Sequence, residues 1–127
     1  MAIEQPCFAV GFMEAAADLS AKQFRCVKVT ADKKINIATA AGEAVLGVLQ
    51  DKPIAGSPGN VMLSGVTKIV AGTGDLAAGA IWETANDGSG ITCTAAKVGL
   101  GTVLIGAAAG ELATVTVGYA TGATIAA

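Results

Sequence analysis

Short apolar runs and stretches of alternating apolar and polar residues recur along the chain from Phe24 onward. Alternation with a period of two places successive side chains on opposite faces, so it predicts half-buried β-strands. The residues between these runs are mostly Gly, Pro, Asp, Asn and Ser, which are typical of turns. We expect strands at 24–30, 35–38, 44–50, 60–63, 66–71, 80–84, 91–94, 102–107 and 112–119. So many short strands predict an all-β barrel-like domain or a sandwich.

Only one stretch has a helical pattern. Residues 13–19 are rich in alanine and predict one or two helical turns at most.

The second half of the chain repeats the order of elements in the first half. A shift of about 54 residues aligns the two halves without a gap. Ala and Gly are abundant, so single matches mean little, but the shared order of turn, strand, Leu-Gly strand, Ala-Gly loop and strand indicates two similar β units around one core. The matched positions are Thr30-Ala31-Asp32 with Thr84-Ala85-Asn86, Ile37 with Ile91, Ala41 with Ala95, Leu46-Gly47 with Leu100-Gly101, Ala55-Gly56 with Ala109-Gly110 and Val61 with Val115.

The ends of the chain lie outside this repeat. Residues 1–20 predict an extended N-terminal arm, 21–119 a barrel-like domain, and 120–127 a C-terminal tail of small residues that is exposed or loosely packed. The arm has an alternating apolar edge, which could add a strand to a neighbouring protein or could be the first strand of the chain's own sheet. This edge consists of Phe8, Val10 and Phe12.

Length and composition favour one small domain. The chain has 127 residues, of which 53% are apolar, 14% charged and 4% aromatic. No apolar run reaches the roughly 18 to 20 residues that span a bilayer, and the first residues lack the basic charge of a secretory signal. We therefore expect a soluble protein made in the cytoplasm. The three cysteines are far apart and predict neither a disulfide framework nor a zinc site.

The charged residues favour neither nucleic-acid binding nor catalysis. The net charge is −2, and the basic residues are scattered. The chain has no histidine, which excludes Ser-His and Cys-His nucleophile pairs and histidine bases. None of the 10 carboxylates belongs to a calcium-binding loop motif. We expect no catalytic residue, metal or cofactor, although spacing alone leaves a pair of distant glycosidase carboxylates open.

Three local features have an ordinary and a functional interpretation. The glycines in 72–79 resemble a dinucleotide-binding loop, but no amphipathic helix follows, so we interpret them as a turn. Lys52 lies in an expected turn between the β units and resembles the modified lysine of lipoyl domains, although Pro53 and the long second unit do not suit that module. Trp82 could be a stacking platform, an interface anchor or part of the core.

Several segments together resemble the capsid decoration, or cement, proteins of tailed phages, which are related in fold to the head-decoration protein of lambda-like phages. The match covers roughly residues 10 to 119. The segments that carry it are Ala17-Asp18-Leu19-Ser20; Gln23-Phe24-Arg25-Cys26-Val27-Lys28-Val29; Val45-Leu46-Gly47-Val48-Leu49-Gln50-Asp51-Lys52-Pro53; 61–72; and Leu76-Ala77-Ala78-Gly79.

This resemblance implies a β-tulip or barrel-like virion protein without catalytic activity. Such proteins bind the exterior of an expanded capsid as homotrimers and bridge subunits of the major capsid protein. Family members often extend a capsid sheet with an N-terminal segment, which fits the expected arm. We therefore take as capsid or trimer interface candidates Phe8, Val10, Phe12, Lys52, Pro53 and Trp82.

Two other classes of function remain open. One is a phage tail or fibre component, and the other is a β module that binds a small ligand such as a carbohydrate. With one Trp and one Tyr, the chain has few aromatic platforms for a sugar.

Overall fold

The computed structural model describes residues 8–94 and 97–118, and this part contains nine strands and no helix. The predicted all-β class is therefore confirmed. The strands are β1 (Phe8–Ala15), β2 (Cys26–Ala31), β3 (Lys34–Ile37), β4 (Gly47–Leu49), β5 (Pro58–Val70), β6 (Ile81–Thr84), β7 (Gly90–Thr92), β8 (Gly101–Ile105) and β9 (Leu112–Val117).

The first half of the chain closes into a barrel-like ring. Its strands follow the order β1-β3-β2-β4-β5, and β1 also pairs antiparallel with β5, which closes the ring. We call this the first ring. Its interior is a cluster of buried apolar side chains, six from its strands and Leu19 from the connection between β1 and β2. These are Met13, Ala15, Leu19, Val27, Ile35, Leu49 and Val61.

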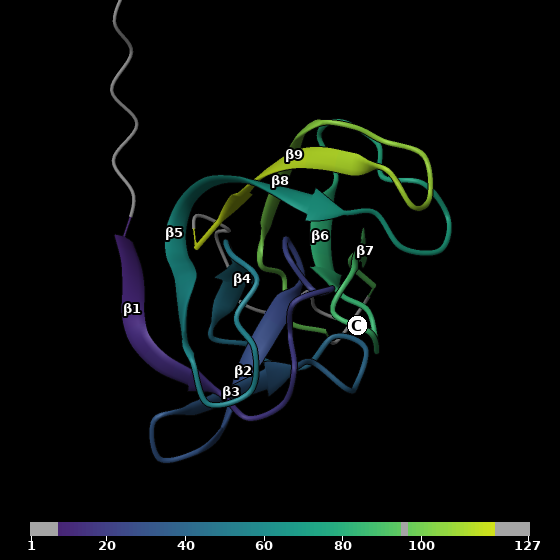
Figure 1. Cartoon of the computed structure of the whole chain (residues 1–127). Coiled ribbons are helices and arrows are strands. Elements are labelled where there is room, and N and C mark those ends of the chain that lie inside the picture. Colours follow the sequence, from purple (N-terminus) through teal and green to yellow (C-terminus); the bar gives the residue numbers. More distant parts are fainter. Residues whose placement is uncertain (1–7, 95–96, 119–127) are drawn as a thin grey trace, which may run out of the picture.

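The second half repeats this arrangement and shares a strand with the first. The order continues as β5-β9-β8-β6-β7, and a parallel bridge between Ala71 and Gly90 joins the end of β5 to β7. We call this the second ring. Figure 1 shows β5 as one long curved strand that runs from the lower group of strands to the upper group. Strand β5 is thus the last strand of the first ring and the first strand of the second.

The strand registers confirm the two similar β units. Val27 pairs with Ile37 in the first ring, as Trp82 pairs with Thr92 in the second. The β4–β5 and β8–β9 pairings also correspond. The gapless alignment is wrong for the first hairpin, where Ile37 corresponds to Thr92 and not to Ile91. The reason is that connection 38–46 is one residue longer than connection 93–100.

The repeated Leu-Gly dipeptide has a steric cause. A Cβ atom on Gly47 would collide with the carbonyl oxygen of Met62, and one on Gly101 with that of Thr116. These glycines are equivalent, and so are the two carbonyl groups that they approach. Each ring therefore needs glycine where β4 or β8 crosses close to the next strand.

Strand β5 replaces two predicted strands. Stretches 60–63 and 66–71 belong to one continuous strand that bends at Gly65, whose φ is 137°. The sequence Ser64-Gly65 has the composition of a turn, which is why a break is expected there. Both sides of the bend are paired to neighbours, so the chain stays in one strand.

The predicted helix at 13–19 is wrong. Met13 and Ala15 are buried in the first core at a spacing of two, and Glu14 and Ala15 pair with β3. Strand pairing and burial override the helix propensity of the alanines. Residues 8–15 thus form a first strand of the chain's own sheet, which was one of the two interpretations of the arm. Residues 1–7 and the predicted tail at 120–127 lie outside the described residues.

Candidate interaction surface

The described residues offer no cluster of metal ligands and no activated thiol, since burial also raises the pKa of the half-buried Cys93. Residues 8–94 and 97–118 contain no group of three His, Cys, Asp or Glu side chains that could hold a metal ion. Cys26 is fully buried, and burial raises the pKa of its thiol to about 12, so the reactive thiolate is scarce. The same part of the chain has no helix with the length and apolar character that a membrane crossing requires.

Two equivalent positions carry opposite charges. In the first ring, the Nζ of Lys28 lies 2.6 Å from the Thr39 hydroxyl and 3.3 Å from a carboxylate oxygen of Glu43. Burial alone would raise the pKa of Glu43, but the N–H groups of Thr39 and Ala40 and the charge of Lys28 hold it below its usual value. Both charged groups of this cluster therefore have hydrogen-bond partners and an opposite charge nearby.

In the second ring the equivalent of Lys28 is Glu83, which is only 2% exposed. The Thr94 hydroxyl donates to its Oε1 at 3.4 Å, while Oε2 has no hydrogen-bond partner among the described residues. Burial raises the pKa of Glu83, and the Thr94 hydroxyl and the charge of Lys97 oppose this shift only in part. The two rings thus have the same cluster with the charges exchanged, and only in the second does desolvation outweigh the partners of the carboxylate.

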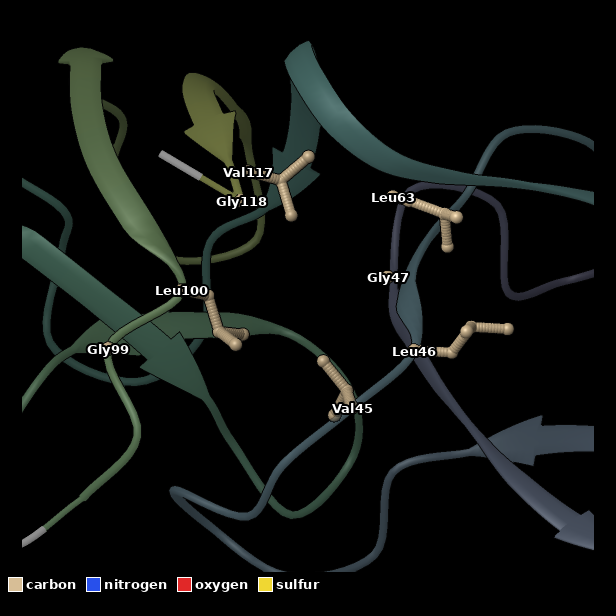
Figure 2. Close-up of a pocket in the computed structure, with 8 residues that line it drawn as sticks. All are labelled: Val45, Leu46, Gly47, Leu63, Gly99, Leu100, Val117 and Gly118. Carbon is tan, nitrogen blue, oxygen red and sulfur yellow. The ribbon is translucent and has the colours of Figure 1, made fainter. Parts of the chain in front are cut away.

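A cavity of about 210 Å³ lies between the two rings. Figure 2 shows its lining side chains coming from both halves of the chain. Glycines and apolar side chains form its walls, so it presents no polar side chain that could orient a small ligand. The lining residues are Val45, Leu46, Gly47, Leu63, Gly99, Leu100, Val117 and Gly118.

Strand β1 exposes two large aromatic side chains. Phe8 is 71% exposed and Phe12 is 61% exposed, whereas Val10 is half-buried against the first core. The register with β5 shifts between Val10 and Met13, so Phe12 lies in a bulge. Within the described chain, no strand pairs with the other edge of residues 8–13. This strand combines exposed aromatic rings with free backbone groups, which suits contact with another protein.

The other predicted interface residues do not gather around β1. Lys52 is exposed, but Pro53 is buried and its carbonyl accepts the Leu19 N–H at 2.9 Å. Trp82 is fully buried in the second core, where its Nε1 donates to the Thr116 carbonyl at 2.9 Å. Pro53 and Trp82 are therefore corrected to structural residues, since neither presents surface to a partner.

Sequence reasoning missed an exposed apolar group on the second ring. Its members lie on β8 and β9 and are 46%, 63% and 48% exposed: Leu104, Ile105 and Leu112. A comparison of the two repeats could have found them, because the equivalent positions in the first ring hold Gln50, Asp51 and Pro58. The fold itself therefore does not require apolar residues there.

Comparison with known proteins gives a likeness in fold. No known family model matches the sequence, and no curated protein matches it. Three chains of solved structures match the structure, and one of them is the N base of head fiber gp8.5 in bacteriophage phi29. Its TM-score is 0.67 at 19% sequence identity, and the alignment covers 90% of this chain and 94% of that chain. The likeness extends over nearly the whole of both chains and shows a common fold.

Proposed function

We propose that this chain is a structural protein of a tailed-phage particle that binds the exterior of the expanded capsid. It acts as a homotrimer, bridges neighbouring subunits of the major capsid protein and catalyses no reaction. The observation that carries the proposal is the likeness in fold, across nearly all of both chains, to the base of a phage head fibre. The resemblance of the sequence to capsid decoration proteins supports the same location.

Strand β1 is the proposed contact with the shell. The exposed Phe8 ring offers apolar surface, and the free strand edge beside Phe8 offers backbone hydrogen bonds to a strand of a capsid subunit. A decoration protein occupies many symmetry-related positions, so modest individual contacts are enough to stabilise a shell.

Binding to expanded shells that lack the protein tests this proposal. The protein should co-sediment with the shells and raise the temperature at which they disrupt. Phe8→Glu should weaken co-sedimentation about tenfold or more, because it places a charge in an apolar contact. The matched control is Ile54→Glu, which changes another apolar residue that is 60% exposed. Failure of the unaltered protein to bind the shells would contradict the proposed function, and equal binding of both variants would contradict the role of β1.

A component of a head or tail fibre is the second candidate, because the structural neighbour is described as the base of a head fiber. A fibre component should be attached to an elongated assembly on the particle and should not stabilise the bare shell. Electron microscopy of the parent particle distinguishes a layer of short protrusions over the capsid from sparse fibres. The carbohydrate-binding alternative is less well supported, because the only tryptophan is buried.

A further inference from the structure

The contact between the two rings has a defined side-chain pattern. The end of the first ring, formed by Phe24 and Gln50, is covered by the part of β5 that begins the second ring. The Val70 N–H donates to the Phe24 carbonyl at 3.0 Å, and the Gln50 Nε2 donates to the Thr67 Oγ1 at 2.9 Å. The Nζ of Lys68 lies 5.8 Å from the centre of the Phe24 ring.

The second ring has an equivalent end that nothing in the described chain covers. Gly79 is equivalent to Phe24, because each has a positive φ and donates its N–H, at 2.8 Å, to the same position in β8 or β4. Leu104 is equivalent to Gln50, which directly follows β4. Leu104 and Ile105 are 46% and 63% exposed at this end. We call the surface formed by Gly79, Leu104 and Ile105 the end face.

Strand β1 has the same place in the first ring as the second half of β5, which covers Phe24 and Gln50, has in the second ring. Val10 is equivalent to Thr67, because the two residues occupy the same register position opposite β5 and β9. The bulge at Phe12 takes the place of Lys68. Among residues 8–94 and 97–118 no further ring lies under β1, and Phe12 is 61% exposed.

The uncovered end face and β1 differ from the inner contact in a complementary way. Within the chain, Gln50 faces Thr67, and the Phe24 ring faces Lys68. At the two uncovered surfaces, both members of each pair are replaced by other residues. An apolar pair stands in place of the polar pair. The aromatic ring belongs to the covering strand β1 and not to the end of the ring. Gly79 has room for it, since nothing lies within 4 Å of a Cβ placed there. Gln50 and Thr67 become Leu104 and Val10, and Phe24 and Lys68 become Gly79 and Phe12.

We propose that a second copy of this chain occupies the end face, with its β1 lying over Gly79 and Leu104 as β5 lies over Phe24 and Gln50. The contact is head-to-tail, so each copy contributes two different surfaces. It repeats between chains the side-chain part of the contact that joins the two rings within one chain, with apolar burial in place of the hydrogen bond between Gln50 and Thr67. The backbone bond of Val70 has no counterpart, because the N–H of the equivalent Glu14 donates to the Lys33 carbonyl. This contact is the one that would hold the proposed homotrimer together. It uses Phe12, whereas the proposed shell contact uses Phe8, so it can be tested without the shell.

The oligomeric state of the full chain tests this proposal. The protein should sediment as an oligomer, whereas Phe12→Glu and Leu104→Glu should each sediment with the mass of one chain. An equal mixture of these two variants retains one intact pair of surfaces, so it should form a dimer and nothing larger. Recovery of a dimer by mixing is specific to a head-to-tail contact, because an interface of two identical patches would stay disrupted.

The controls separate loss of contact from loss of fold. Phe12→Lys and Leu104→Gln introduce the residues that the other ring carries at the equivalent positions, so the fold tolerates them, and they should also give single chains. Ile54→Glu, which changes an apolar residue that is 60% exposed, should leave the oligomer intact. Trp82 fluorescence during urea unfolding reports whether each variant is folded. A monomeric unaltered protein, oligomers that persist in both folded variants, or a mixture that remains monomeric would each overturn the proposal.

Discussion

At the residue scale, the repeat provides an internal comparison for each buried group. Lys28 and Glu83 occupy equivalent positions in the two rings, and a threonine contacts each one. Lys28 also has a carboxylate partner at 3.3 Å, whereas one oxygen of Glu83 has no partner among the described residues. A buried carboxylate without its full set of hydrogen bonds destabilises the fold. The cluster around Glu83 therefore contributes less to folding stability than the cluster around Lys28.

We expect Glu83→Gln to stabilise the protein at neutral pH by about 1 kcal/mol. The pKa of Glu83 is raised above its ordinary value of 4.5, so the folded state binds the proton more tightly than the unfolded chain does. The contribution of Glu83 to stability is therefore fully present below pH 4.5 and is lost as the pH rises through the folded-state pKa. Urea unfolding at several pH values should show an advantage of the variant that is absent in acid and grows towards pH 7.

The matched control is Glu43→Gln, because the pKa of Glu43 is lowered. Its stabilising contribution is present above the ordinary carboxyl pKa and is lost as the pH falls through the lowered value. This variant should therefore be less stable than the unaltered protein at neutral pH. If the two variants changed stability in the same direction, the contrast between the two clusters would be wrong.

At the element scale, β5 makes the two rings one structural unit. It pairs with β1 and β4 through its first half and with β9 through its second. Because no linker separates the rings, loss of one ring removes a strand from the other. We therefore expect the two rings to unfold together.

We expect Leu49→Ala, a change in the first core, to lower the stability reported by Trp82 in the second core. Leu49 is fully buried, so the loss should be about 2–5 kcal/mol. Trp82 fluorescence and far-ultraviolet circular dichroism should give the same urea midpoint. The control Val29→Ala alters a residue that is 52% exposed and should change stability by less than about 0.5 kcal/mol. Separate transitions for the two probes would show that the rings unfold independently.

The elements also show why prediction from sequence succeeded in part. The alternation and the Leu-Gly repeat were enough to predict the class and the two similar units, because both depend on local burial and close backbone approach. The helix at 13–19 was wrong because the pairing of Ala15 with β3 depends on a distant part of the chain. The end face was missed because the exposure of Leu104 depends on which distant segments pack over it, and the local pattern does not show this.

At the scale of the whole molecule, the exposed surface relevant to assembly is apolar. Large apolar side chains are exposed on β1 at one end of the repeat and on β8 and β9 at the other. The net charge is only −2, so long-range attraction to a charged partner is weak. The proposed assembly contacts therefore depend on burial of apolar surface.

We expect binding to expanded shells to be nearly insensitive to salt. An increase from about 0.1 M to about 1 M sodium chloride shortens the screening length from about 10 Å to about 3 Å, which weakens contacts between exposed charges. Co-sedimentation across this range should change the affinity by less than about threefold, since apolar contacts are not screened. A tenfold or greater loss would indicate that ion pairs dominate the contact with the shell.

The single strand common to both rings also determines how the molecule would carry a mechanical load. Strand β5 has 13 residues and hydrogen-bonds to neighbours in both rings. Two barrels joined by a flexible linker would swing apart under tension, whereas here a pull on one barrel passes directly into the strand of the other. Because the hydrogen bonds on both halves of β5 belong to one strand, the two barrels cannot separate unless some of these bonds break.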